Sequence, residues 1–106
     1  MLEERKRRIG ENEGIFRDVN EQVRRLDPTW MTILCECGDE GCREHLVIDH
    51  RRYAEVREDS TRFILRPGHE EADTEEVVSR DLEFWIVRKR PGLPAAIARK
   101  TDSSAR

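Results

Sequence analysis

The stretch CECGDEGC, residues 35–42, decides how this chain folds. It places three cysteines within eight residues and interleaves them with glycine and acidic residues. A segment this polar is a poor fit to a core, whereas thiolates gathered by a glycine-containing turn are typical metal ligands. The C-x-C-x4-C spacing therefore predicts that Cys35, Cys37 and Cys42 form most of a metal site. Zn²⁺ is the metal expected there, since it binds thiolates and imidazoles tetrahedrally.

A closed tetrahedral site needs a fourth ligand, and the three histidines are the candidates. His69 follows the turn residues Pro67 and Gly68, so it would reach the ion from a second turn, as in zinc ribbons. His45 is separated from Cys42 by only two residues and is sterically possible. His50 begins a predicted helix and is expected to be exposed. The sequence favours His69, with His45 or a water molecule as the alternatives.

The composition suggests why a metal would be useful to this chain. It has 106 residues, of which 36% are hydrophobic and 41% are charged, so we expect one small domain with a thin core. Metal binding is then expected to supply a large part of the folding free energy. The longest apolar run, residues 30–35, is too short for a membrane span or a signal peptide. The predicted location is therefore cytoplasmic, where thiols stay reduced, and the odd number of cysteines further favours metal binding or a reactive thiol over disulfides.

Outward from the cysteines, the patterns predict an α+β fold. An N-terminal amphipathic helix is followed by a small zinc-ribbon-like antiparallel β domain with one short helix, which Asp49 would cap. The predicted divisions are an N-terminal helix (1–28), a zinc-binding domain (29–90) and a flexible C-terminal tail (91–106), whose few apolar residues are expected to lack a packing partner. The acidic segment 70–76 is expected to be exposed. Strands are predicted at 30–35, 45–48, 62–66, 77–78 and 84–87.

The N-terminal helix shows a heptad pattern of apolar residues. This narrow stripe predicts either self-association or docking of a protein partner, or simple packing of the helix on the chain's own sheet. Gly10 and Gly14 are expected to weaken the first turns. The stripe consists of Leu2, Ile9, Phe16 and Val23 at one seam position, with Val19 and Leu26 at the other.

Several motifs together resemble a small family of actinobacterial zinc-binding proteins that has no established activity. Besides the cysteine cluster, these are NEGIFRDVN at 12–20, YAEVR at 53–57, RF at 62–63, PGH at 67–69 and VV at 77–78. The resemblance covers about 80 residues. It implies that His69 is the fourth ligand, and it implies no particular function.

The function that these observations favour is a protein-interaction or regulatory module with a structural zinc site. A nucleic-acid-binding zinc ribbon is one alternative, although the net charge is −3 and acidic residues are interleaved with the basic clusters along the chain. A redox sensor based on the thiolates is another. No enzyme is expected, because the His-Glu-x-x-His, deaminase and phosphate-loop motifs are absent. Glu36 and Glu40 are expected to lie in a solvated turn, which makes a zinc-dependent hydrolase the weaker alternative.

Overall fold

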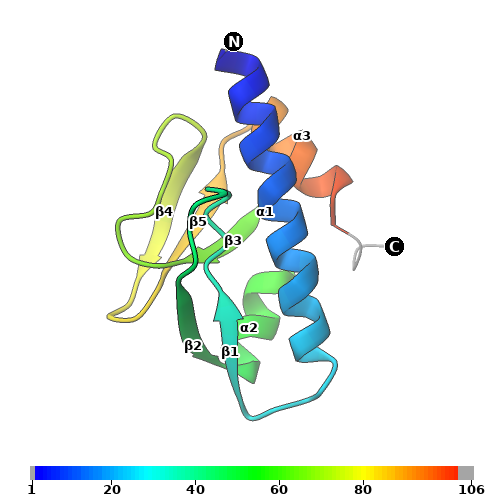
Figure 1. The fold of residues 1–106 in the computed structure, drawn as a ribbon, viewed down its shortest axis with the longest axis vertical. Helices are drawn as coiled ribbons and strands as arrows, with labels where there is room; N and C mark the ends of the chain where they lie inside the picture. The colour runs from blue at the N-terminus through cyan, green and yellow to red at the C-terminus, as the bar shows by residue number, and fades with distance from the viewer. Residues whose placement is uncertain (1, 103–106) are drawn as a thin grey trace.

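The computed structural model describes residues 2–102 and confirms the α+β class (Figure 1). Every predicted strand is present, and none of the helices in the described residues is long and apolar enough to cross a membrane. The elements are α1 (Leu2–Arg24), β1 (Trp30–Leu34), β2 (His45–Asp49), α2 (His50–Arg57), β3 (Arg62–Leu65), β4 (Glu75–Arg80), β5 (Trp85–Lys89) and α3 (Leu93–Lys100).

The strands form two antiparallel sheets, a β1–β2 hairpin and a three-stranded sheet in the order β3-β5-β4. Both hairpin strands alternate between exposed and buried residues, which is the two-residue period of a half-buried strand. Their buried residues join others from α2, β3 and β5 in what we call the hairpin cluster. It comprises Met31, Ile33, Leu46, Ile48, Tyr53, Val56, Ile64 and Ile86.

A second cluster lies where the three-stranded sheet meets α3 and the turn at residues 35–42, here called the cysteine turn. We call it the cysteine cluster, because two of its buried members are thiols. Strand β3 contributes to both clusters, since alternate residues of a strand face opposite ways. The cysteine cluster comprises Cys35, Cys37, Phe63, Leu65, Val87 and Ala98, with Trp85, Val77 and Cys42 packed against it.

Strand β2 runs into α2 with no intervening residue. Asp49 is the last residue of the strand, and its Oδ1 accepts a hydrogen bond from the backbone N–H of Arg52 at 2.8 Å. The predicted helix cap is thereby confirmed. The cap directs Tyr53 and Val56 into the hairpin cluster.

Helix α1 buries a polar face rather than the predicted apolar stripe. Val19 is 43% exposed and Leu26 is 80% exposed, so the stripe as a whole does not pack on the chain's own sheet, although Val23 contacts the hairpin cluster. The side chain of Leu2 lies outside the described residues. The buried face recurs every three or four positions and comprises Gly10, Glu13, Gly14, Arg17, Asn20 and Glu21.

The expectation that residues 91–106 lack a packing partner is wrong for the described part of this segment, up to residue 102. Helix α3 lies beside α1 and buries Ala95 and Ala98 (Figure 1). Gly10 and Gly14 permit this approach, because a Cβ at either would come within 2.9 Å of an α3 side chain or its cap residue. They are packing residues, whereas the sequence suggested only a weakened helix. Residues 103–106 lie outside the described residues.

A buried ion cluster, here called the Lys89 triad, lies between α1 and the β4–β5 strands. The Nζ of Lys89 lies 2.5 Å from Glu13 Oε1 and 2.8 Å from Glu75 Oε2, and all three residues are buried. The expected exposure of 70–76 is therefore wrong for Glu75. Burial, together with the nearby Glu75 carboxylate, holds the pKa of Glu13 well above its ordinary value.

Candidate metal centre

Four side chains converge between the cysteine turn and the turn that follows β3. Cys35, Cys37, Cys42 and His69 each offer one ligand atom, and these atoms all lie within 4.8 Å of one another. His69 Nδ1 is 3.5 Å from Cys35 Sγ and 3.8 Å from Cys42 Sγ. The favoured set of sequence-predicted residues is thus brought together, although His69 is 27 residues from the nearest cysteine.

The cysteine turn is held against α1 at Gly38. Gly38 has φ +78°, a conformation that L side chains rarely adopt. A Cβ at this position would also lie 2.7 Å from the backbone oxygen of Ile9 in α1. The carbonyl of Gly38 accepts a hydrogen bond from Asn12 Nδ2 at 3.1 Å. Glycine is therefore required here both by the backbone conformation and by the close approach of the helix.

Asp39 returns the chain toward the first two cysteines. Its carboxylate accepts the N–H of Gly41 at 2.8 Å, and its carbonyl accepts the N–H of Cys42 at 3.0 Å. Such a turn, closed by an aspartate side chain, is a common way to reverse a chain. It brings the third sulfur back beside the other two.

His69 is oriented from two sides. Its backbone N–H donates to the carbonyl of Arg66 at 3.1 Å, which closes the Pro67-Gly68 turn. Its Nε2 lies 2.8 Å from the Glu44 carboxylate, and Nδ1 faces the sulfurs. A ligating histidine commonly places its other ring nitrogen on a carboxylate, which fixes the tautomer and the ring orientation. The Glu44 carboxylate lies in this position, and no sequence motif marked it as part of the site.

The pKa values of the three thiols are shifted in different directions. The pKa of Cys37 is lowered to about 5, chiefly because the Cys35 thiol donates a hydrogen bond to its sulfur, with a further contribution from the backbone N–H of Asp39. The same hydrogen bond, together with burial, raises the pKa of Cys35. Burial also raises the pKa of Cys42. Because a bound divalent cation favours thiolates, it would displace the protons that these sulfurs otherwise share.

The donor set and its spacing fit a zinc ion. Bonds of about 2.3 Å to sulfur and about 2.0–2.1 Å to nitrogen, at tetrahedral angles, place a ligand nitrogen about 3.6 Å from a ligand sulfur. The two distances from His69 Nδ1 to sulfur, 3.5 and 3.8 Å, lie close to this spacing. Cys35 and Cys37 are buried, and the backbone N–H of Arg66 donates to Cys35 Sγ at 3.2 Å. Three soft sulfurs and one imidazole are ligands that suit zinc.

The other two histidines are placed elsewhere. His45 is exposed on β2 and is not part of the four-residue group. His50 is half-buried, and its Nδ1 lies 2.9 Å from the carbonyl oxygen of Pro28. Its expected exposure is therefore only partly met, and neither histidine competes with His69 in this conformation.

Of the two glutamates expected in a solvated turn, only Glu40 is exposed. Glu36 is 0% exposed, so the expectation is wrong for this residue. The two-residue period of an extended segment could have indicated a separate contact for residue 36, because it places this residue on the face opposite residues 35 and 37. A charged side chain is ordinarily expected in solvent, so this indication was not followed.

A cleft with a volume of about 660 Å³ opens beside the site, between α1 and the two turns. Cys37 and His69 form part of its wall, while Arg5 and Arg8 approach it from the helix. One side of the ligand set is therefore within reach of small molecules in solvent, including chelators. Comparison of the chain with models of known protein families, with curated proteins and with solved structures finds no match.

Proposed function

We propose that this chain is a small zinc-binding protein whose metal site is structural and supports a protein-interaction or regulatory surface. The observation that carries the proposal is the convergence of Cys35, Cys37, Cys42 and His69, with ligand atoms within 4.8 Å of one another although His69 is remote in sequence. A metal held there would join the turn after β1 to the turn after β3, and so would fasten the two sheets together.

The number of ligands supports a structural rather than a catalytic role. A catalytic zinc site typically has three protein ligands and leaves one position for water or substrate, whereas a structural site is closed by four. The set proposed here has four protein ligands. The Glu44 carboxylate contacts His69 Nε2, so it has the position of an orienting group rather than of a general base.

The test is a metal analysis of the purified chain and of matched histidine variants. We expect one zinc per chain by elemental analysis, and a cobalt-substituted protein with the absorption bands of a tetrahedral site bearing three thiolates. His69→Ala should weaken zinc binding strongly, whereas His45→Ala should leave it unchanged, because only His69 faces the sulfurs. Zinc binding that survives in His69→Ala but not in His45→Ala would contradict the assignment.

The proposed interaction surface is the outward face of α1, through which the chain would contact a protein partner or a second copy. Ile15 and Val19 of α1, and Leu26 in the turn that follows the helix, support this assignment, since all three are exposed apolar residues. Sedimentation analysis of the wild type and of Ile15→Glu tests self-association, because Ile15 is an exposed apolar residue of α1. If the wild-type chain self-associates through this face, the variant should sediment as a monomer with unchanged zinc content. If both proteins have the same oligomeric state, α1 does not form the contact between copies.

A further inference from the structure

We infer that Glu36 is a positioning residue of the metal centre. It holds residues 35–37, here called the cysteine arm, in register with the strand that leads to His69. This inference rests on the proposed zinc site. It assigns a function to a buried glutamate that touches none of the ligand atoms. The role follows from three features of Glu36: its place between two ligands, its double attachment to β3, and its fully engaged carboxylate.

Glu36 lies between two ligands in sequence and points away from them. The flanking cysteines face His69 and one another, whereas the Glu36 carboxylate contacts α1, α2 and β3. At the same point the chain passes from one sheet to the other. The N–H of Cys35 donates to Glu44 O beside the hairpin at 3.0 Å, and the N–H of Glu36 donates to Ile64 O of β3 at 2.9 Å. Residues 35 and 36 therefore join the two sheets.

The attachment to β3 has two points. Besides the backbone bond to Ile64 O, Glu36 Oε1 accepts the N–H of Ile64 at 2.9 Å. Both polar backbone groups of Ile64 are thus bound by a single residue of the cysteine arm. Strand β3 ends at Leu65, and the Pro67-Gly68 turn then leads to His69. Fixing Glu36 on Ile64 consequently fixes the cysteines relative to the histidine.

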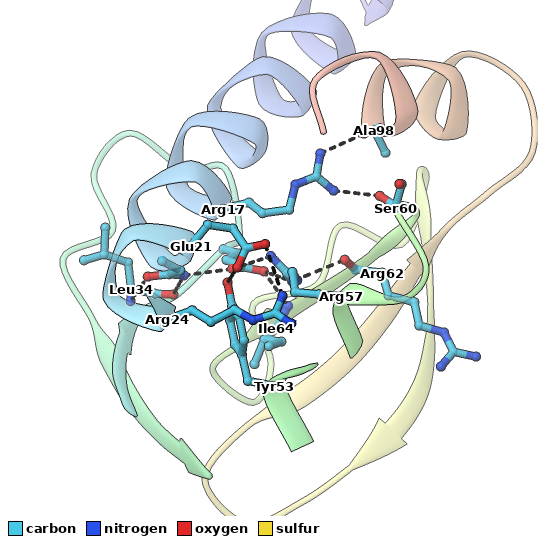
Figure 2. A network of polar contacts seen from close by, with 12 residues as sticks. Arg17, Glu21, Arg24, Leu34, Tyr53, Arg57, Ser60, Arg62, Ile64 and Ala98 are labelled. Atoms are coloured by element: carbon cyan, nitrogen blue, oxygen red, sulfur yellow. Dashed lines mark hydrogen bonds and ion pairs between the residues drawn. The ribbon is translucent and has the colours of Figure 1, made fainter. Parts of the chain in front are cut away.

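The carboxylate is held by two further side chains. Arg57 of α2 binds it with both terminal nitrogens, at 2.7 Å to Oε1 and 3.0 Å to Oε2, and Figure 2 shows Arg57 at the centre of this network. Asn20 of α1 donates to Oε2 at 2.8 Å and also binds both backbone groups of Leu34. Each carboxylate oxygen therefore accepts two donors, and α1, α2 and β3 all meet at this group. A paired arrangement of this kind is geometrically specific as well as strong.

Glu36→Gln is the discriminating substitution. It keeps the shape of the side chain but places an amide NH₂ where one oxygen now accepts two donors, so a donor must face donors whichever way the amide is turned. Loss of partners that orient metal ligands commonly weakens affinity about 10–100-fold. We expect Glu36→Gln to lose zinc affinity in this range, and its cobalt-substituted form to show altered band positions and intensities.

The matched control is Glu21→Gln, the same substitution in the same buried network. Glu21 accepts from Tyr53 Oη and pairs with Arg24, and it makes no contact with the cysteine arm. It should lower the melting temperature while leaving zinc affinity within about twofold of wild type, since a side chain that does not hold the cysteine arm cannot orient the metal ligands through it. Arg57→Lys, which loses the paired contact but keeps the charge, guards against a misfolded Glu36→Gln protein and should weaken zinc binding about tenfold.

The outcomes separate the two levels of inference. A wild-type chain that binds zinc, together with Glu36→Gln and Arg57→Lys variants that match its affinity and cobalt spectrum, would overturn the positioning role alone. An equal loss of affinity in Glu21→Gln would also overturn it, because the effect would then be general destabilisation. Failure of the wild-type chain to bind zinc would overturn the proposed function, and this inference with it.

Discussion

The two buried clusters are built from different kinds of residue. The hairpin cluster consists of aliphatic side chains with a single tyrosine, whereas two of the six buried members of the cysteine cluster are thiols. Charged groups border both clusters, since Arg17 lies over the Phe63 ring at 4.6 Å and Arg57 lies over the Tyr53 ring at 5.0 Å. The two clusters therefore differ in their buried residues rather than in their charged surroundings, and only the cysteine cluster contains ligands of the proposed metal. The comparison teaches that a chain with little apolar material can concentrate it in one cluster and use a metal, as proposed, to stabilise the other.

The largest expected effect comes from removing the metal, which should act on the cysteine cluster first. A ligand at 1,000 times its dissociation constant stabilises the folded state by about 4 kcal/mol. Chelation, or Cys37→Ser, should therefore lower the free energy of unfolding by about this amount relative to the zinc-loaded chain. Trp85 packs against the cysteine cluster whereas Trp30 is mostly exposed, so the change should appear in tryptophan fluorescence. Identical melting curves with and without bound zinc would contradict the prediction.

Ile33→Ala tests the hairpin cluster. Ile33 is 1% exposed in the hairpin cluster, and truncating a buried isoleucine costs about 2–5 kcal/mol. We expect a loss of about 3 kcal/mol in urea unfolding, with zinc affinity within about twofold of wild type, because Ile33 packs in the hairpin cluster whereas the ligands belong to the cysteine cluster. Thr32→Ala, at the exposed neighbouring position of the same strand, is the matched control and should change stability little. A large loss of zinc affinity in Ile33→Ala would show that the two clusters are not independent.

Gly38→Ala and Gly68→Ala form a pair that isolates the contact between α1 and the cysteine turn. Both glycines have similar positive φ, +78° and +85°, so both substitutions should carry the backbone cost of about 1–2 kcal/mol. Only at Gly38 does an added Cβ meet the backbone of Ile9, whereas at Gly68 it meets nothing within 4 Å. Gly38→Ala should therefore destabilise by about 1 kcal/mol more, and should weaken zinc binding more, because the turn must move. If the two variants lose the same stability and the same zinc affinity, the contact with Ile9 has no role in either property.

Glu13→Gln should give the smallest effect, and its sign should be stabilising. A group whose pKa is raised on folding contributes stability at low pH that is lost as the pH rises through its folded-state pKa. Glu13 is such a group because burial raises its pKa, and glutamine mimics its protonated form. The variant should therefore gain stability relative to wild type as the pH rises, and the gain should shrink as the pH falls. Urea unfolding at a series of pH values measures it.

Glu75→Gln is the control for this prediction. It removes the other carboxylate of the Lys89 triad, but Glu75 Oε1 also accepts the N–H of Glu71 at 2.7 Å. The substitution should therefore not reproduce the gain. A Glu13→Gln protein that loses stability as the pH rises, as steeply as wild type does, would show that Glu13 is ionised in the fold.

Local patterns predicted most of the fold and the candidate ligand set. The alternation in HLVI marks β2, Asp49 marks the start of α2, and the Pro67-Gly68 turn marks the return of the chain at His69. What the sequence did not predict depends on contacts across long separations. The glycines of α1 meet α3 more than 80 residues away, and Glu13 meets Lys89. Charged residues in a helix are usually expected to face solvent, because burying a charge is costly unless an opposite charge lies beside it. A local pattern does not show that a distant residue supplies that charge.

The absence of a loop between β2 and α2 has a consequence for how the molecule opens. Asp49 is paired with Trp30 across the hairpin and also caps the helix, so a single residue belongs to both elements. Loosening the first turn of α2 therefore loosens the last pair of the hairpin, and the reverse is also true. Hydrogen exchange separates proteins into regions that open cooperatively. In this chain β1, β2 and α2 should exchange as one such region, with their amides becoming accessible together.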